Sequence, residues 1–127
     1  MSKEHILNIL KSLKKRPTSL EKRMINLVEK HNLPYKYTGD GSFIIGYKNP
    51  DFINVNGEKI CIEVYYSYQK NHFFGSENNY KNQRKEHFAK YGWKTLFFNE
   101  NQLKETEILK RLNLMPNTPM ENCMLLT

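Results

Sequence analysis

The sequence predicts an α/β fold in which a mixed β-sheet is flanked by helices. Apolar residues recur at helical spacing over 3–14 and again from Thr18, whereas short strand-like runs begin at Tyr35. Residues 59–98 then read as a strand–helix–strand unit beside a hairpin, a combination that requires both parallel and antiparallel pairing. The expected order of elements is α-α-β-β-β-β-α-β-α.

The first two helices are separated at Pro17. In the segment 3–14, Ile6, Ile9, Leu10 and Leu13 share one helical face. Thr18-Ser19-Leu20-Glu21 fits a capping box, in which a hydroxyl and a carboxylate bind free amides of the first turn. We expect the second helix to end near Asn32, ahead of Pro34.

The middle of the chain is expected to form four strands joined by turns. Their predicted ranges are 35–37, 43–47, 51–55 and 59–65. Asn56-Gly57 is a strong hairpin signal, because both residues tolerate positive φ angles. The third and fourth strands should therefore pair with each other.

After the strands, residues 66–75 are expected to form a polar and aromatic loop. Ser76 can cap a helix that runs to Tyr91, and Gly92 is well placed to end it. A strand over 93–98 and a helix over 102–113 follow.

Length and composition indicate one domain of ordinary globular type. The 127 residues are 39% hydrophobic and 26% charged, which excludes a disordered chain. We divide them into a basic N-terminal arm (1–17), a core (18–114) and a loosely ordered tail (115–127). No apolar run approaches the ~20 residues of a membrane span, and no signal peptide is evident, so the simplest location is cytoplasmic. Cys61 and Cys123 show no metal-site spacing.

The net charge of +7 is concentrated near the N-terminus. Residues 1–36 hold nine Lys or Arg and three Asp or Glu. A one-sided basic surface favours a polyanionic partner such as nucleic acid, although charge alone serves solubility equally well.

Asp51 and Glu63 are the strongest candidates for chemistry. They stand at the same end of the predicted hairpin, where two carboxylates can hold a hard cation such as Mg²⁺. A two-residue turn at Asn56-Gly57 would put them on opposite faces of the sheet. We predict a one-residue shift that pairs Asp51 with Glu63, because it also brings Phe52 and Ile62 onto one core face. The alternative is that Asp51 starts a turn and Glu63 faces solvent.

Several further short motifs occur in a characteristic order. They are Glu21 on a helix, Tyr37-Thr38-Gly39-Asp40-Gly41, Asn49-Pro50-Asp51-Phe52, Ile62-Glu63-Val64, Gln83-Arg84, Tyr91-Gly92-Trp93 and the strand that ends at Phe98. In this order, residues 18–98 resemble the PD-(D/E)xK nuclease superfamily, in particular the very-short-patch-repair endonucleases and the related small homing endonucleases. The resemblance implies a restriction-endonuclease-like fold and metal-dependent cleavage of DNA.

The resemblance also assigns roles to individual residues. Asp51 and Glu63 match the acidic metal ligands, and Glu21 matches a helix glutamate that reaches the metal site. For Glu21 the capping box is an equally good interpretation. Arg84 resembles a helix residue that faces the same site, or it is a surface arginine.

One position departs from the superfamily pattern. Tyr65 stands where the superfamily has a lysine, and the repair enzymes and their homing relatives place a histidine soon after this strand. Gln69 occupies one expected spacing, and Lys70 and His72 are rival candidates for the missing role. A histidine could act as acid or base, and a lysine could stabilise charge at the phosphate. His72 could equally be an exposed loop residue.

These observations lead to the hypothesis of a Mg²⁺-dependent (or Mn²⁺-dependent) endonuclease that cleaves double-stranded DNA. One site cuts one strand, so a double-strand cut needs a homodimer or sequential nicks. The expected DNA contacts are Lys11, Lys14, Lys15, Arg16, Lys22, Arg23 and Arg84. The alternatives are a non-catalytic DNA-binding module on the same fold and a structure-specific nuclease such as a junction resolvase.

Overall fold

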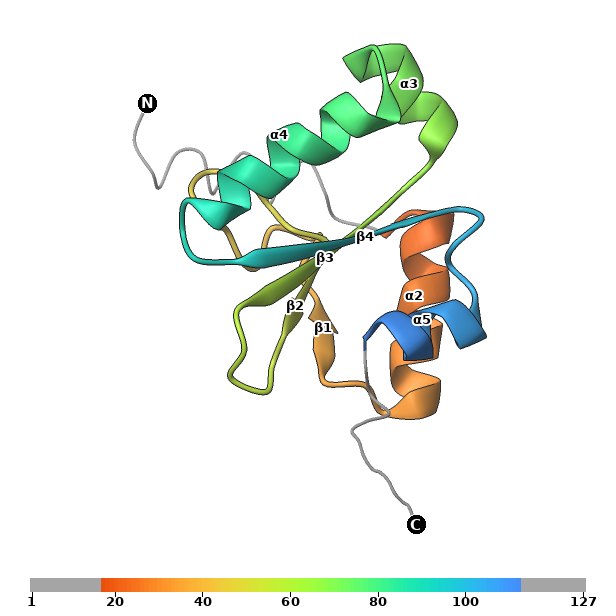
Figure 1. Ribbon diagram of the computed structural model, residues 1–127. Helices are drawn as coiled ribbons and strands as arrows, with labels where there is room; N and C mark the ends of the chain where they lie inside the picture. The colour runs from red at the N-terminus through yellow and green to blue at the C-terminus, as the bar shows by residue number, and fades with distance from the viewer. Residues whose placement is uncertain (1–16, 113–127) are drawn as a thin grey trace.

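A four-stranded mixed sheet organises the chain and is shown in Figure 1. The structure is a computed structural model, and it describes residues 17–112. Its elements are α2 (Ser19–His31), β1 (Tyr35–Tyr37), β2 (Phe52–Asn54), β3 (Ile60–Tyr65), α3 (Ser67–Phe74), α4 (Glu77–Ala89), β4 (Lys94–Asn99) and α5 (Glu105–Arg111). The α/β class with a mixed sheet is confirmed. The helix expected over 3–14, most of the arm and the tail lie outside the described residues.

The strand order β1-β2-β3-β4 follows the chain. The first three strands are antiparallel neighbours, and β4 runs parallel to β3 after the crossover through α3 and α4. In Figure 1, α4 covers one face of the sheet, and α2 and α5 lie on the other. The face toward α2 and α5 buries the larger apolar cluster, centred on Phe52, Ile62 and Phe98. The α4 face buries the smaller cluster, centred on Cys61 and Phe88, and a separate aromatic cluster of Tyr65, Tyr80 and Phe97.

The register of the hairpin confirms the predicted shift. Phe52 pairs with Ile62 and Ile53 with Cys61, so Asp51 stands opposite Glu63. The shift arises because the hairpin loop is longer than two residues. Asn54 stabilises this longer loop, since its Oδ1 accepts hydrogen bonds from the backbone N–H groups of Asn56 and Glu58.

The strand expected over 43–47 was wrong. This segment forms a tight turn in which Ile45 and Lys48 make one isolated β-bridge. Gly46 and Tyr47 between them have φ angles of 54° and 70°, a left-handed conformation that ends any strand. The apolar side chains that suggested a strand belong to the smaller cluster instead: Ile45 is one of its buried members, and Phe43 packs against it.

The loop expected over 66–75 was also wrong, because Ser67–Phe74 form the helix α3. No residue of α3 is buried, and no side chain caps its first turn, so helical periodicity and capping signals were both missing. Tertiary contacts stabilise it instead: Glu100 accepts hydrogen bonds from both the backbone N–H and the hydroxyl of Ser67.

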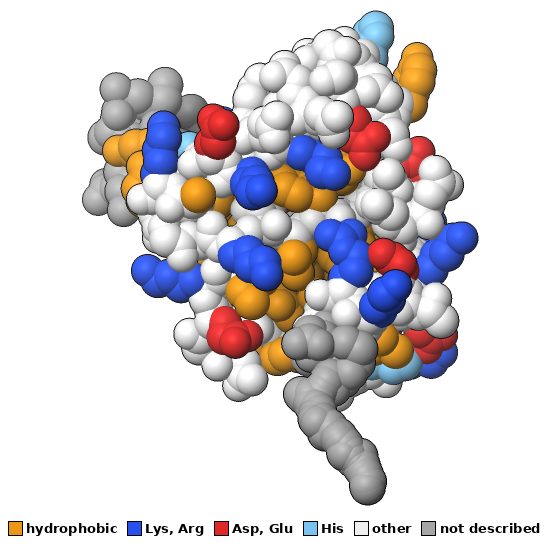
Figure 2. Space-filling view, viewed as in Figure 1, with side chains coloured by type: hydrophobic (Ala, Val, Ile, Leu, Met, Phe, Trp, Pro, Cys, Tyr) orange, Lys and Arg blue, Asp and Glu red, His pale blue; other side chains and the backbone are white. Residues whose placement is uncertain are grey.

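The surface over β4 is basic and partly apolar, as Figure 2 shows. The ammonium of Lys81 lies 5.8 Å from the ring centroid of Phe97, and the guanidinium of Arg111 lies 4.2 Å from that of Phe98. Positive charge is therefore not confined to the N-terminal quarter. None of the helices within residues 17–112 has both the length and the apolarity needed to cross a membrane.

Replacing Phe52 by alanine should destabilise the fold strongly. The ring is fully buried in the larger cluster and contacts Tyr37 edge-on at 5.4 Å between centroids. We expect a loss of about 3–5 kcal/mol in the free energy of unfolding, measured by urea denaturation. Val55→Ala on the same hairpin is the control, because Val55 is 57% exposed. Equal losses for the two variants would contradict the assignment of the core.

Candidate active site

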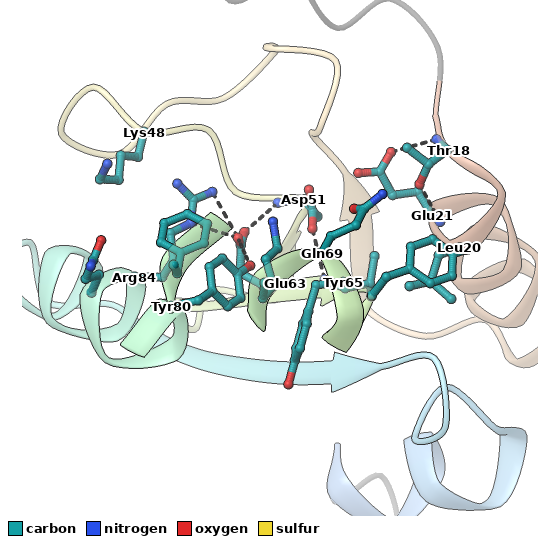
Figure 3. A pocket seen from close by; sticks show the side chains of 15 residues that line it. Thr18, Leu20, Glu21, Lys48, Asp51, Glu63, Tyr65, Gln69, Tyr80 and Arg84 are labelled. Atoms are coloured by element: carbon teal, nitrogen blue, oxygen red, sulfur yellow. Dashed lines mark hydrogen bonds and ion pairs between the residues drawn. The ribbon is translucent and has the colours of Figure 1, made fainter. Parts of the chain in front are cut away.

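A cavity of about 360 Å³ opens where β3 and the start of β2 meet the N-terminus of α2, the helix α3 and the first half of α4. Its wall includes three carboxylates, from Glu21, Asp51 and Glu63, and three cationic side chains, from Lys48, Lys70 and Arg84. Figure 3 shows Asp51 between Glu21 on one side and Glu63 on the other. The cavity therefore gathers most of the candidate residues of the core.

Asp51 and Glu63 are tied to each other's strands. The backbone N–H of Asp51 donates to Oε2 of Glu63 at 3.0 Å, and Oδ2 of Asp51 accepts from the backbone N–H of Val64 at 2.9 Å. Both side chains are buried, at 5% and 2% exposure. The interpretation of Glu63 as a solvent-facing residue was therefore wrong, and the paired carboxylates have fixed positions.

A short polar turn places Asp51 at the start of β2. Thr38 binds this turn twice, because its N–H donates to the carbonyl of Asp51 at 2.7 Å and its hydroxyl to that of Pro50 at 2.8 Å. The side-chain amide of Asn49 donates to the carbonyls of Thr38 and Phe43, at 2.6 and 2.9 Å. The Asn49-Pro50-Asp51 motif is thus held by hydrogen bonds on several sides.

Two residues of α4 neutralise and orient Glu63. Arg84 donates from Nε to Oε1 of Glu63 and places Nη2 at 2.9 Å from the same oxygen. Nη2 also donates to the carbonyl of Asn49 at 3.1 Å. The Tyr80 hydroxyl donates to Oε1 of Glu63 at 3.1 Å. Arg84 therefore joins Glu63 to the turn that carries Asp51.

The pKa directions agree with this arrangement. Burial lowers the pKa of Arg84, but the charge of Glu63 and its hydrogen bond raise it more, so the net direction is upward. Burial raises the pKa of the Tyr80 hydroxyl, and the negative charge of Glu63 raises it further. Arg84 thus stays a cation and Tyr80 a neutral donor, the states that a buried carboxylate requires.

Glu21 both caps α2 and lines the cavity, the two roles that its sequence position allowed. The backbone N–H of Thr18 donates to its Oε1 at 2.9 Å, and the N–H of Glu21 donates to the Thr18 hydroxyl at 3.2 Å, which completes the capping box. The Tyr37 hydroxyl donates to the same oxygen of Glu21 at 3.1 Å. Glu21 is also buried and lines the cavity, so capping does not remove it from the site.

Of the two rival candidates for the role of the missing lysine, both on α3, only one lies at the cavity. Lys70 lines the cavity, with its ammonium 4.4 Å from the ring centroid of Tyr80. His72 is exposed, stacks on Tyr68 and lies outside the cavity lining. Gln69 is part of the wall. The ring of Tyr65 points away from the carboxylates in Figure 3, and its hydroxyl donates to Glu77.

The residues expected to contact DNA fall into three groups. Four of them, Lys11, Lys14, Lys15 and Arg16, lie outside the described residues. Lys22 is exposed on α2, whereas Arg23 beside it donates to the carbonyl of Leu103 at 2.6 Å. Arg84 is not a surface arginine, since its side chain is only 22% exposed and is engaged with Glu63.

The carboxylates of the cavity provide a limited set of ligands for a metal ion. Within residues 17–112, no group of three or more His, Cys, Asp or Glu side chains is arranged to hold one. Glu21 is therefore not gathered with Asp51 and Glu63 into a three-ligand set. Two buried carboxylates at an open cavity still fit Mg²⁺, which uses one or two carboxylates and keeps several waters. Zinc, which favours nitrogen and sulfur ligands, fits poorly.

Sequence reasoning missed three residues of the site: Asn49 as an anchor, Tyr80 as a donor and Lys48 as part of the wall. Tyr80 and Arg84 are four residues apart on one helix, a spacing that places both on the same face. A buried aromatic one turn from an arginine was the signal available for this pair. The sequence held no comparable signal for Lys48.

No family model and no curated protein matches this sequence. Among solved structures, the fold is similar to that of the homing endonuclease I-Bth0305I catalytic domain, with a TM-score of 0.53 and 18% sequence identity. The match covers 76% of this chain and 90% of that one. At this identity the likeness establishes a shared fold, and it supports the nuclease-like architecture that the sequence resemblance implied.

Replacing Arg84 by an uncharged residue should destabilise the fold, because Glu63 would lose its buried counter-charge. Arg84→Met leaves a carboxylate of 2% exposure without its guanidinium partner. We expect a loss of about 3–5 kcal/mol in the free energy of unfolding, measured by urea denaturation.

The double variant Glu63→Gln/Arg84→Met is the matched control, because it removes both charges. It should recover part of the stability that the single variant loses. If Arg84→Met loses less than about 1 kcal/mol, the buried ion pair is not the constraint described above.

Proposed function

We propose that this protein is a metal-dependent DNA endonuclease that hydrolyses phosphodiester bonds, on a fold of the PD-(D/E)xK type. The observation that carries the proposal is the pair Asp51 and Glu63, which face each other at the start of β2 and in β3 and are buried in the lining of a cavity. The fold shared with a homing endonuclease catalytic domain supports the same reaction. The proposed substrate is double-stranded DNA.

Asp51 and Glu63 would hold Mg²⁺ or Mn²⁺, with Glu21 lining the same cavity. When bound, the metal supplies positive charge beside the phosphodiester and lowers the pKa of water. The protein's own part is positioning: the Asp51 and Val64 amides fix the two carboxylates, and Arg84 fixes Glu63 from behind. This preorganisation leaves little reorganisation for the substrate to drive.

Lys70 is the proposed replacement for the superfamily lysine. It enters the cavity from α3 rather than from the strand, and its ammonium lies over the Tyr80 ring next to Glu63. A cation in this position can bind a phosphate oxygen and stabilise the charge that develops there. Exposed His72 has no comparable position.

A second candidate is a non-catalytic DNA-binding module, and one observation favours it. Glu63 already accepts hydrogen bonds from Arg84, Tyr80 and the Asp51 amide, so its carboxylate is well satisfied without a metal. Such a module would bind DNA in a salt-sensitive and metal-independent way, and it would not cleave the DNA.

Among catalytic alternatives, we propose a patch-repair or homing type of enzyme, which nicks as a monomer or cuts both strands as a homodimer, rather than a junction resolvase.

Plasmid nicking in Mg²⁺ tests the metal pair. Asp51→Asn keeps the size of the side chain, and its amide oxygen can still accept the Val64 N–H, but it removes the charge. We expect cleavage to fall by about 100-fold or more, because the loss of even an outer-shell partner of a metal ligand costs about 10–100-fold. Adding EDTA to the wild type should have the same result.

Glu58→Gln is the control, because Glu58 lies exposed in the loop of the same hairpin. It should cleave like the wild type. Undiminished cleavage by Asp51→Asn would overturn the proposed site. Salt-sensitive binding without nicking of plasmids or of four-way junctions would instead establish the binding module.

A pair of variants decides between Lys70 and His72. Lys70→Met keeps the stem that contacts the aromatic rings and removes the charge. It should lower the cleavage rate by about 100-fold, because a preorganised charge at the phosphate is lost. His72→Asn should stay within a few-fold of the wild type in the same assay. The reverse ranking would assign the role to His72.

A further inference from the structure

A second cavity, of about 350 Å³, lies at the turn over residues 43–48. Its lining includes four aromatic side chains, from Phe43, Tyr47, Tyr91 and Trp93. Phe43 and Trp93 meet edge-on at 5.5 Å between centroids, while Tyr47 and Tyr91 are about half exposed, at 52% and 48%. The volume is at the small end of the range for ligand sites, and the open rings offer faces for stacking.

One residue that lines this cavity, Tyr47, has a disfavoured backbone conformation. Tyr47 has a φ of 70°, which a bulky side chain rarely adopts and which glycine or asparagine would adopt more easily. The turn is rigid all the same, since Ile45 and Lys48 exchange two backbone hydrogen bonds and a ring nitrogen of His87 contacts the Ile45 carbonyl at 3.0 Å. A Cβ atom on Gly46 would meet the Tyr91 ring at 2.1 Å. Strain of this kind is often retained where a side chain contacts a ligand.

The turn connects this aromatic cavity to the acidic one. Tyr47 lines the aromatic cavity, and the next residue, Lys48, lines the cavity that contains Asp51 and Glu63. Exposed Lys90 precedes Tyr91 in the chain, and the Lys59 side chain lies near Gly92, which follows Tyr91. Cationic side chains therefore occur both at the acidic cavity and near the aromatic one.

We propose that the aromatic cavity takes an unpaired nucleobase from the DNA strand whose backbone lies at Asp51 and Glu63. This inference rests on the proposed function and adds a base-binding subsite to it. Stacking on aromatic side chains suits any base, because every base has a π-face, so the subsite selects for an unpaired nucleotide rather than for a sequence. Lys48 would bind the phosphate between the two cavities.

Trp93 provides a direct readout, because it is the sole tryptophan of the sequence. The full-length protein is titrated in EDTA with a duplex that carries one unpaired nucleotide, and tryptophan fluorescence is followed. The same duplex with an abasic residue at that position is the matched probe. We expect quenching and about tenfold tighter binding for the duplex with the base.

Substitutions at the two exposed tyrosines test the contact itself. Tyr47→Leu and Tyr91→Leu should remove most of the difference between the two duplexes, and Tyr47→Phe should keep it. Tyr68→Leu on α3 is the control, since Tyr68 is 77% exposed and lines neither cavity.

Tyr47→Gly relieves the strain, so it should raise the melting temperature while it lowers base binding. Lower stability with unchanged discrimination would show a purely structural tyrosine and overturn the proposal.

The two proposals can fail separately. Preference for the base-containing duplex in a protein that does not cleave DNA would support the subsite and overturn the nuclease. Mg²⁺-dependent cleavage in a protein that binds both duplexes equally, with Trp93 fluorescence unchanged, would overturn the subsite alone.

Discussion

The pairing of Asp51 with Glu63 across β2 and β3 is the constraint on which the rest of the site depends. It follows from a one-residue shift in the hairpin, and a different register would send one of the two carboxylates to the opposite face of the sheet. The shift also aligns Phe52 with Ile62 in the larger apolar cluster. The same packing that stabilises the sheet therefore concentrates negative charge beside its two inner strands.

The buried charge of Glu63 is compensated by side chains of α4. A carboxylate at 2% exposure needs a cation and hydrogen-bond donors, and Arg84 and Tyr80 supply them from adjacent turns of one helix. Because Arg84 also binds the carbonyl of Asn49, the helix, the turn before β2 and the middle of β3 form one connected unit. Lys70 and Glu21 then close the cavity from α3 and α2. The acidic cavity is thus a consequence of the sheet register and of the helices needed to neutralise it.

Sequence patterns predicted those parts of the fold whose signals are local. The capping box at Thr18 and the alternation in Ile60–Tyr65 led to correct elements, and the shared core face of Phe52 and Ile62 led to the correct register. The strand expected over 43–47 failed because Tyr47 adopts a backbone conformation that its residue type does not suggest. Helix α3 was missed because its stability depends on Glu100, 33 residues away from Ser67.

The candidate site divides in the same way. Asp51, Glu63 and Glu21 could be named from motifs, and the structure places all three at one cavity. The contacts that give the site its electrostatics, from Arg84 and Tyr80 to Glu63, span 21 and 17 residues and depend on how α4 packs on the sheet. Likewise, only the path of α3 shows that Lys70 rather than His72 enters the cavity.

The central claim is that the Asp51–Glu63 pair is a cation site. Anomalous diffraction from a crystal of the full-length protein soaked in Mn²⁺ tests it most directly. We predict one anomalous peak within coordination distance of both carboxylates, with Arg84 still bound to Glu63. A peak elsewhere in the molecule, or none in a crystal whose cavity is open to solvent, would contradict the account.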